Sequence, residues 1–338
     1  MAQRNIIVIG ASVGGVDALQ RLVSGLPKDF PAAMFVVLHV PSEGASVLPE
    51  ILKRAGELPA SHPRDGDSIR TGHIYVAPPG NHLLIEDGRV RVMHGPKENR
   101  HRPAIDPLFR SAAAWYGPRV IGVVLTGAMD DGTAGLLSVK KRGGVAIVQD
   151  PEDAICADMP RSALEAVEVD HVAPLDRMPG LLQELVGEQV AENGTGKSSR
   201  LTKENKIARL DMDTIEDENR PGKPSTFGCP ECGGVLWELD GEQMVRFRCR
   251  VGHAYTASSL GLEQSDEVER ALWAAMRGME EAAALARRMA ERAELGKHPR
   301  LAKQYRDRAE GKMEQAELLR NLIVESKTGP VAAEKRVS

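Results

Sequence analysis

Short apolar runs alternate with amphipathic segments over the first half of the chain. Runs typical of buried strands occur at residues 6–9, 34–38, 74–77, 120–125 and 145–148. Apolar positions recur at helical spacing between them, for example over residues 106–116 and 133–142. This alternation predicts an α/β fold, doubly wound around a mainly parallel sheet.

One segment departs from the alternation. Residues 83–92 form two alternating runs separated by Asp87 and Gly88, a pair that is typical of a hairpin turn. We therefore expect an antiparallel hairpin on the mainly parallel sheet.

The second half of the chain has a different pattern. Residues 187–225 are polar, with few apolar positions, which predicts a flexible linker. The pattern divides the chain into an α/β domain, this linker, a small cysteine-containing domain, a helical hairpin and a disordered tail. Their expected bounds are 1–186, 187–225, 226–262, 263–326 and 327–338.

Composition narrows the class of protein. The 338 residues carry a formal net charge of −4, which gives no general attraction to nucleic acid or to a membrane surface. No apolar run reaches the ~18 residues of a membrane span, and no signal-peptide pattern precedes the first strand. We expect a cytoplasmic protein that neither binds nucleic acid nor inserts into a membrane.

Ser12 lies at the turn between the first predicted strand and the first predicted helix. The run GASVGG occupies residues 10–15, and a helical pattern begins at Val16. Free backbone N–H groups and the positive end of the helix dipole meet at such a turn, so an oxyanion is stabilised there. Ser12 is therefore a candidate nucleophile.

A dinucleotide-binding oxidoreductase is the competing interpretation of this turn. The pattern G-x-S-x-x-G differs from the dinucleotide fingerprint by a serine where a glycine lets the pyrophosphate approach. That fingerprint also requires an acidic residue after the next strand, and this chain has His39 there. The sequence thus favours a serine hydrolase with His39 as its base.

A third strand supplies carboxylates to the same edge of the sheet. The run over residues 120–125 is followed by a loop that contains Asp130 and Asp131. Because the carboxyl ends of parallel strands meet at one edge, a serine, a histidine and an aspartate become available together there.

Six motifs occur in the order seen in one known family. They are GASVGG at 10–15, LHVP at 38–41, APPGNH at 77–82, RPAIDPLF at 102–109, LTGAMDDG at 125–132 and MPRSA at 159–163. About the first 185 residues resemble the catalytic domain of the chemotaxis protein-glutamate methylesterases, the CheB family.

The resemblance implies a role for each candidate residue. Ser12 would be the nucleophile and His39 the general base and acid. The family's aspartate directly precedes the loop glycine, which selects Asp131 over Asp130. Its oxyanion contacts would come from the backbone N–H groups of Val13 and Ala128.

The chain also departs from the family pattern. Val13 stands where the family commonly has threonine, and Ala128-Met129 replaces the usual Met-Gly of the loop. The family has an N-terminal receiver domain that regulates the esterase. Since the first strand is expected at Asn5, we expect a receiver-less form.

The small domain carries a metal-binding pattern. Cys229 and Cys232 are followed, after sixteen residues, by Cys249 and, after three more residues, by His253. Three thiolates and one imidazole make a complete tetrahedral set for structural zinc, with no open position for catalysis. A hairpin between the two pairs predicts a zinc ribbon, the alternative being free thiols or a disulfide.

The last segment predicts two helices. Apolar residues recur three and four apart on either side of a break at residues 296–299. The expected seam contains Val268, Leu272, Ala275, Met279, Ala282, Ala286 and Met289, then Leu301, Tyr305, Ala309, Met313, Ala316, Leu319 and Ile323. We interpret the pair as intramolecular, with a partner-docking coiled coil as the alternative.

These observations predict a protein-glutamate methylesterase without a catalytic cofactor. Its substrate would be a glutamyl methyl ester on the cytoplasmic helices of a chemoreceptor or on another methylated protein, and the family also hydrolyses some glutamine side chains. The C-terminal extension would regulate the enzyme or bind a protein partner. A nucleotide-binding oxidoreductase and a non-catalytic signalling module remain the alternatives.

Overall fold

The computed structural model describes residues 2–191, 199–209, 211, 213–214, 222–239, 241 and 243–328. The chain divides into two compact units, Met1–Leu260 and Gly261–Ser338. The tail expected from residue 327 lies outside the described residues from 329 onward.

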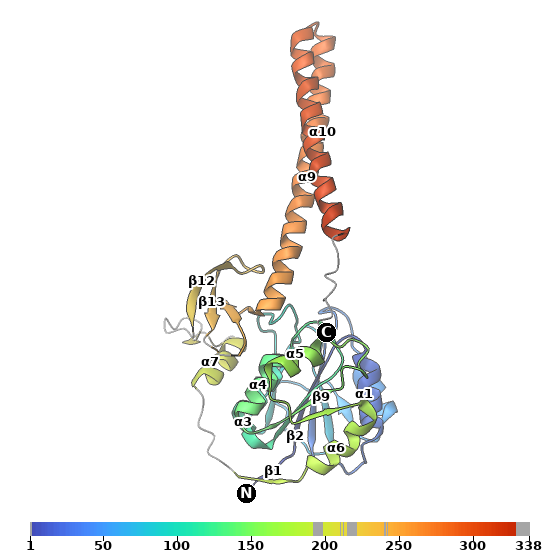
Figure 1. Ribbon diagram of the computed structural model, residues 1–338, viewed down its shortest axis with the longest axis vertical. Coiled ribbons are helices and arrows are strands. Elements are labelled where there is room, and N and C mark those ends of the chain that lie inside the picture. The colour runs from blue at the N-terminus through green and yellow to red at the C-terminus, as the bar shows by residue number, and fades with distance from the viewer. Residues whose placement is uncertain are drawn as a thin grey trace, which may run out of the picture. The chain divides into compact units, whose positions relative to one another are not determined.

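A seven-stranded sheet forms the centre of the first unit (Figure 1). Its order is β10-β9-β8-β2-β3-β5-β4, and every neighbouring pair is parallel. The strands are β2 (Ile6–Ala11), β3 (Ala33–Leu38), β4 (Ala60–Ser61), β5 (His73–Val76), β8 (Val120–Val124), β9 (Val145–Gln149) and β10 (His171–Ala173). Since β2 lies between β3 and β8, the three strands expected to carry the site are neighbours.

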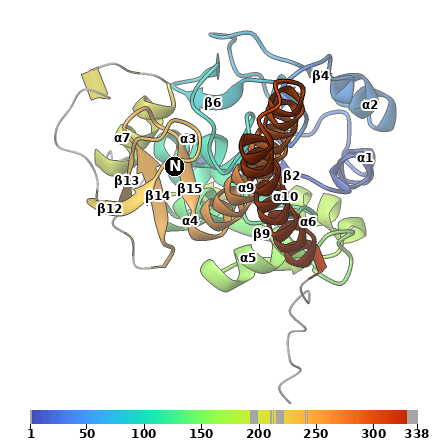
Figure 2. The same cartoon turned by 90° about the horizontal axis from the view of Figure 1, so that it is seen from above.

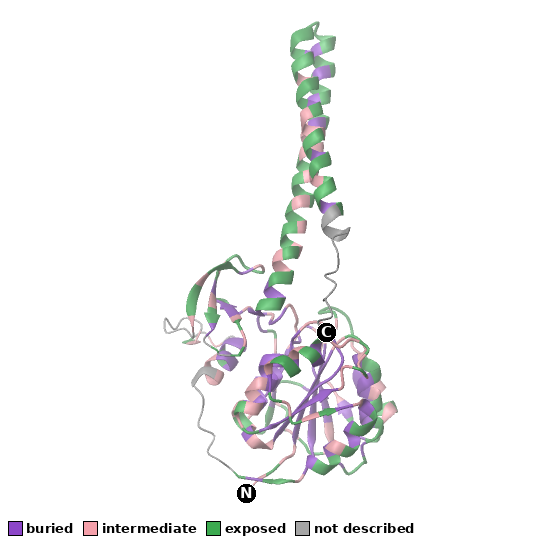
Figure 3. Ribbon diagram, in the orientation of Figure 1, coloured by how far each residue is buried: buried purple, intermediate pink, exposed green. Residues whose placement is uncertain are grey.

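Helices cover both faces of this sheet, as predicted. Ile7 and Ile9 of β2 pack into a core with α1, α2 and α6, and the alternate residues Ile6 and Val8 into a second core with α3, α4 and α5. The helices are α1 (Gly15–Ser24), α2 (Leu48–Ala55), α3 (Ile105–Tyr116), α4 (Thr133–Lys141), α5 (Asp158–Ala166) and α6 (Met178–Leu185). Figure 3 shows the strands buried between these two layers.

Three short elements complete the frame. The 3₁₀ turns η1 (Gly117–Arg119) and η2 (Leu175–Arg177) precede β8 and α6. Strand β1 (Ala2–Gln3) pairs antiparallel with β11 (Gln189–Val190), which joins the two ends of the α/β domain.

The predicted antiparallel hairpin is present, but its expected place on the main sheet is wrong. β6 (His82–Glu86) and β7 (Arg89–Met93) pair with each other as a separate two-stranded sheet. The hairpin instead packs against α3, where the Ser111 hydroxyl accepts a hydrogen bond from the Ile85 N–H at 3.1 Å.

The segment expected to be a linker contains ordered structure. Helix α7 (Ser199–Ala208) packs against α3, with Glu204 and Asn205 buried. Glu204 and Asn205 are buried in ion pairs and hydrogen bonds, so the low apolar content of α7 does not mean that the segment is unpacked. The rest of the predicted linker includes residues 192–198 and 215–221, which lie outside the described part of the chain.

A four-stranded antiparallel sheet follows in the cysteine-containing segment. Its strands are β12 (Lys223–Gly228), β13 (Val235–Leu239), β14 (Arg246–Cys249) and β15 (Ala254–Thr256). β13 and β14 form the hairpin predicted between the two pairs of metal-ligand candidates. Figures 1 and 2 both show this sheet beside α7, and we call residues 223–256 the ribbon.

Two helices make up the second unit from Gly261 onward, with the break where the pattern predicts it. They are α9 (Ala257–Leu295) and α10 (Pro299–Thr328), and Glu280 of α9 pairs with Arg320 of α10. Part of the predicted seam is wrong, because Val268, Ala275, Met289 and Leu301 are exposed. The buried residues are mainly alanines, which let the helices approach closely: Ala283, Ala286, Ala290, Ala293, Ala302, Ala309 and Ala316, with Ile323. None of the helices in the described residues combines the length and apolar character that a membrane span requires.

Candidate active site

Ser12 lies where β2 turns into α1. Its N–H donates to the Thr126 carbonyl oxygen at 3.0 Å, which ties the turn to the loop after β8. Gly14, the residue before the helix, has a φ of 77°, and a Cβ there would lie 2.8 Å from the side chain of Ile155. The glycine therefore meets both a backbone and a space requirement of this turn.

His39 follows β3, beside the Ser12 turn. Its N–H donates to the Ala11 carbonyl oxygen at 3.1 Å, and its Nε2 lies 2.8 Å from Oδ2 of Asp131. The side chains of His39 and Asp131 are 5% and 1% exposed. The structure thus brings together the histidine and the aspartate that the sequence selected.

Asp131 is held by several donors besides His39. The Ile105 N–H donates to Oδ2 at 2.7 Å, and the Gly132 N–H and the Asn99 side-chain amide donate to Oδ1 at 3.0 and 2.9 Å. Burial alone would raise the pKa of Asp131, but hydrogen bonding to His39 and the charge of that ring lower it to about 2. Asp131 is therefore an ionised acceptor at neutral pH.

Asp130 has a different partner. Its Oδ1 accepts a hydrogen bond from the Thr256 hydroxyl at 3.0 Å. Burial raises the pKa of Asp130 to about 6, against the opposing effect of this hydrogen bond. The geometry thus agrees with the selection of Asp131 over Asp130 as the partner of His39.

The second ring nitrogen of His39 is buried without a partner. Within the described residues, Nδ1 makes no hydrogen bond, so Ser12 and His39 are not bonded to each other in this arrangement. Since Nε2 is engaged by Asp131, Nδ1 is the nitrogen left to accept a proton from a nucleophile. The catalytic roles of the three residues stay a prediction at this point.

His101 is a site residue that the sequence analysis missed. Its ring stacks on that of His39, with centroids 3.6 Å apart and planes 8° from parallel. Burial, helped by the charge of His39, lowers the pKa of His101 to about 4, so the stacked ring is neutral at pH 7. No spacing rule connects two histidines 62 residues apart, and only the position of His101 beside the RPAIDPLF motif gave a signal.

The proposed oxyanion donors lie in two loops that are fastened together. The Thr126 hydroxyl donates to the carbonyl oxygens of Val13 and Cys156 at 2.9 and 3.2 Å. A Cβ on Gly127 would lie 2.8 Å from the Cβ of Ser12, so only glycine permits this approach. Among the described residues, the N–H groups of Val13 and Ala128 make no backbone hydrogen bond. Their role as oxyanion donors stays a prediction.

The three cysteines and the histidine of the ribbon converge. The ligand atoms of Cys229, Cys232, Cys249 and His253 all lie within 4.8 Å of one another. Sγ of Cys232 is 3.7 Å from Sγ of Cys249, and Nδ1 of His253 is 3.5 Å from Sγ of Cys249 and 3.7 Å from Sγ of Cys229. All four cysteines of the chain are free, which excludes the disulfide alternative in this structure. The four groups could hold a metal ion.

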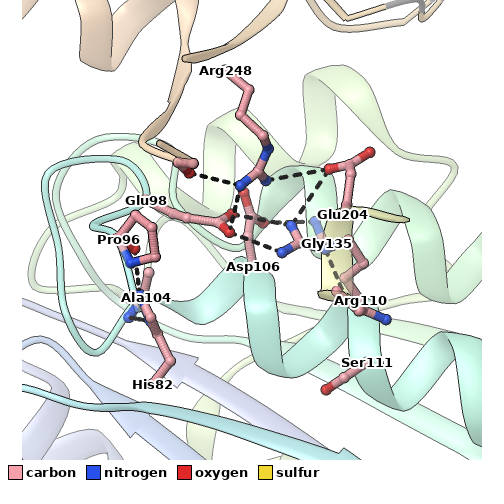
Figure 4. Close-up of polar contacts among 12 residues, drawn as sticks. His82, Pro96, Glu98, Ala104, Asp106, Arg110, Ser111, Gly135, Glu204 and Arg248 are labelled. Atoms are coloured by element: carbon pink, nitrogen blue, oxygen red, sulfur yellow. Dashed lines mark hydrogen bonds and ion pairs between the residues drawn. The ribbon is translucent and has the colours of Figure 1, made fainter. Parts of the chain in front are cut away.

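A buried ion cluster joins the ribbon to the α/β domain (Figure 4). Glu98 receives hydrogen bonds from Arg110 of α3 at 2.9 and 3.1 Å and from Arg248 of β14 at 3.1 Å. Glu204 of α7 pairs with Arg246 at 3.1 Å and lies 3.5 and 3.6 Å from the other two arginines. The charges of Arg110 and Arg248 outweigh burial and lower the pKa of Glu98 to about 2. We call these five residues the ion cluster.

Comparison with known proteins is consistent with this geometry. The chain matches the CheB methylesterase family over residues 7–182. It is 40% identical over 184 residues to the protein-glutamate methylesterase/protein-glutamine glutaminase 2 of Anaeromyxobacter dehalogenans, which is 54% of each chain. It is also 40% identical over 176 residues to a putative protein of the same description from Leptospira interrogans, which is 52% of this chain and 91% of the relative.

A solved structure shows the same fold. The catalytic domain of the Thermotoga maritima CheB methylesterase is 36% identical, with a TM-score of 0.52, and covers 55% of this chain and 100% of that domain. The chain spans about half the length of some relatives, since the match covers 54% of the Anaeromyxobacter protein and 49% of one from Xanthomonas euvesicatoria.

Proposed function

Because the chain belongs to the CheB methylesterase family, we propose that it is a protein-glutamate methylesterase with Ser12, His39 and Asp131 as its catalytic residues. The observation that carries the proposal is the 2.8 Å contact between His39 and Asp131 beside the Ser12 turn. In this assignment Nδ1 of His39 faces the reaction, since Nε2 is bound to Asp131.

The first half of the reaction forms an acyl-enzyme. Ser12 Oγ attacks the carbonyl carbon of a glutamyl methyl ester while Nδ1 of His39 takes its proton. The N–H groups of Val13 and Ala128 donate to the oxyanion, each contributing about 3 kcal/mol of barrier lowering. His39 then returns the proton to the departing methoxy oxygen, and methanol leaves.

The second half regenerates the serine. His39 removes a proton from water, the hydroxide attacks the acyl carbon, and the proton returns to Ser12 as a free glutamate is released. Asp131 holds the imidazole in one tautomer and stabilises its charged form throughout. A glutamine side chain follows the same route, with ammonia as the leaving group.

The substrate we propose is a methylated glutamate on the cytoplasmic helices of a chemoreceptor or on a related signalling protein. The names of the relatives support a methylated protein glutamate as the substrate, and the receptor and a cytoplasmic location are part of our proposal. Family membership also removes the reason for a dinucleotide interpretation of residues 10–15.

Substitution of the nucleophile tests the function. Ser12→Ala in the full chain should lower methanol release from a methylated receptor fragment by at least about 10³-fold, because the remaining residues cannot form the acyl-enzyme. Release is measured from a radiolabelled methyl group.

Ser138→Ala is the matched control for this experiment. Ser138 lies on α4 and donates to the Ala134 carbonyl oxygen, away from Ser12. The control should keep wild-type activity. Equal methanol release by the wild type and Ser12→Ala would refute the assignment.

For the ribbon we propose a structural zinc ion held by Cys229, Cys232, Cys249 and His253. A tetrahedron with Zn–S of about 2.3 Å and Zn–N of about 2.0–2.1 Å has edges of about 3.5–3.8 Å. The contacts of 3.5–3.7 Å among these atoms fit that shape. Elemental analysis of the purified chain should find about one zinc per molecule, and Cys232→Ser should lose it while Cys156→Ser keeps it.

A further inference from the structure

A chain of hydrogen bonds leads from the ribbon to the catalytic pair. The N–H of Thr256 donates to Oδ1 of Asn99 at 3.0 Å. The side-chain amide of Asn99 in turn donates to Asp131 Oδ1 at 2.9 Å, and Asp131 binds His39. Asn99 is 3% exposed, so water does not compete for these bonds.

The direction of the Asn99 amide is determined by its neighbours. A backbone N–H can only donate, so the Asn99 atom that faces Thr256 has to be the oxygen. The Ser259 hydroxyl donates to the same oxygen at 3.3 Å. The amide nitrogen therefore faces the carboxylates, and its two hydrogens reach Asp131 and Asp106, both at 2.9 Å.

The two carboxylates need this donor. Asp131 and Asp106 are both buried, and burial together with the charge of Asp131 raises the pKa of Asp106 to about 7. An N–H donor shared between them offsets their repulsion and favours the ionised form of Asp131. Without the amide, the pair would hold a proton to a higher pH, and Asp131 would bind His39 less well.

The ribbon also holds the backbone on either side of this amide. The Asn99 N–H donates to the Ala254 carbonyl oxygen at 2.8 Å, and the Ala254 N–H donates to the Lys97 carbonyl oxygen at 3.2 Å. Asn99 has a φ of 49°, a left-handed conformation that asparagine adopts more readily than most residues. Glu98, which lies between Lys97 and Asn99 in the chain, is one of the two carboxylates of the ion cluster.

We propose that Asn99 is a positioning residue for the catalytic pair and that the ribbon makes the esterase competent by fixing its orientation. The proposal rests on the methylesterase function above and adds a regulatory role for the ribbon. Whatever loosens β15 releases the Asn99 oxygen, frees the amide to rotate and leaves Asp131 beside an uncompensated carboxylate.

Asn99→Asp tests the donor directly. Aspartate has the same size and tolerates the same φ, but when ionised it accepts only. We expect kcat to fall by about 10- to 100-fold with KM within about twofold, and the acid limb of the pH profile to move to higher pH. Asn99→Ala should lower kcat less, because it removes the donor without adding a charge.

Asn5→Asp is the matched control. Oδ1 of Asn5 only accepts, from Arg119 at 2.8 and 3.2 Å, and Asn5 lies at the opposite end of β2. It should keep wild-type kcat. Wild-type kcat in Asn99→Asp, with an unchanged melting temperature, would overturn the proposal.

A double-mutant cycle tests whether the ribbon acts on the catalytic pair through Asn99. Ser259→Ala removes the hydroxyl that donates to the Asn99 oxygen and accepts a hydrogen bond from the Thr256 N–H. We expect a severalfold loss of kcat that is smaller in the Asn99→Ala background, because the same link is already cut. Equal losses in both backgrounds would show that the ribbon does not act through Asn99.

A spectroscopic measurement separates this proposal from the proposed function. The Nε2–H proton between His39 and Asp131 should give a low-field NMR signal, assigned by its absence in His39→Gln. It should weaken or shift in Asn99→Asp and remain in Asn5→Asp. The signal reports how His39 and Asp131 are positioned and does not depend on turnover of a substrate. It therefore tests the role of Asn99 even where equal methanol release by the wild type and Ser12→Ala refutes the proposed function. An unchanged signal in Asn99→Asp would contradict the proposal.

Discussion

In the seven-stranded sheet, neighbouring strands meet through apolar side chains such as Ile9, Val36 and Val123, all buried. Where the ribbon meets α3 and α7, the contact is made by two carboxylates and three guanidinium groups. Apolar packing tolerates many combinations of shape, whereas a buried charge tolerates only the partner that neutralises it. Apolar packing in the sheet therefore positions the strand ends that carry the site, and the ion cluster makes the docking of the ribbon on α3 and α7 specific.

Removal of the metal should have the largest effect, because we expect it to unfold the ribbon and not the parallel sheet. Binding of structural zinc amounts to about 10–16 kcal/mol in small zinc domains, so its loss should unfold β12–β15 and leave the parallel sheet folded. Hydrogen exchange read by mass spectrometry, with and without a chelator, should show lost protection in β14 and retained protection in β9. Equal loss in both strands would mean that they form one cooperative unit.

Glu98→Ala should have the next largest effect. It leaves Arg110 and Arg248 buried without their main partner, and we expect a loss of about 3–5 kcal/mol in the free energy of unfolding, measured with urea. Arg21→Ala is the control, because its pair with Asp176 is exposed and contributes about 0–1 kcal/mol. A loss below about 1 kcal/mol for Glu98→Ala would remove the contrast between the two kinds of contact.

The acid dependence of stability should show a smaller effect of the same cluster. The pKa of Glu98 is lowered from 4.5 to about 2 by its arginines, so its contribution is fully present above pH 4.5 and is lost as the pH falls towards 2. The pKa of Asp106 is raised from 3.8 to about 7, so its effect on stability has the opposite sign: it lowers the free energy of unfolding as the pH rises from 3.8 to about 7. Between pH 5 and pH 2.5, the free energy of unfolding should fall less steeply in Glu98→Gln than in the wild type. Identical pH dependence in Glu98→Gln and the wild type would contradict the lowered pKa of Glu98.

The sequence predicted the sheet and the serine and histidine positions because both depend on local patterns. Strands such as β2 and β8 are continuous apolar runs, and a polar residue directly after such a run lies at the sheet edge. The sequence pattern alone did not separate Asp131 from Asp130, which needed the resemblance to a family and then the contacts of each carboxylate.

The missed features depend on contacts between distant segments. The pattern of α7 resembles a polar linker because Glu204 pairs with Arg246, 42 residues away on β14, and Asn205 binds Arg110 at a separation of 95 residues. Asn99 and His101 lie in a loop with no periodicity, so the only local signal is their position just before the motif at 102–109. The alanine seam was misplaced because Val268 and Met289 fit the spacing equally well and are larger.

The bond from Thr256 to Asn99 spans 157 residues of chain. During translation the α/β domain leaves the ribosome long before Thr256 does, so a nascent chain can fold its sheet while the amide beside Asp131 still has no fixed direction. We expect the newly made esterase to turn over more slowly until its C-terminal part is synthesised, which would restrain unfinished copies from acting on their targets.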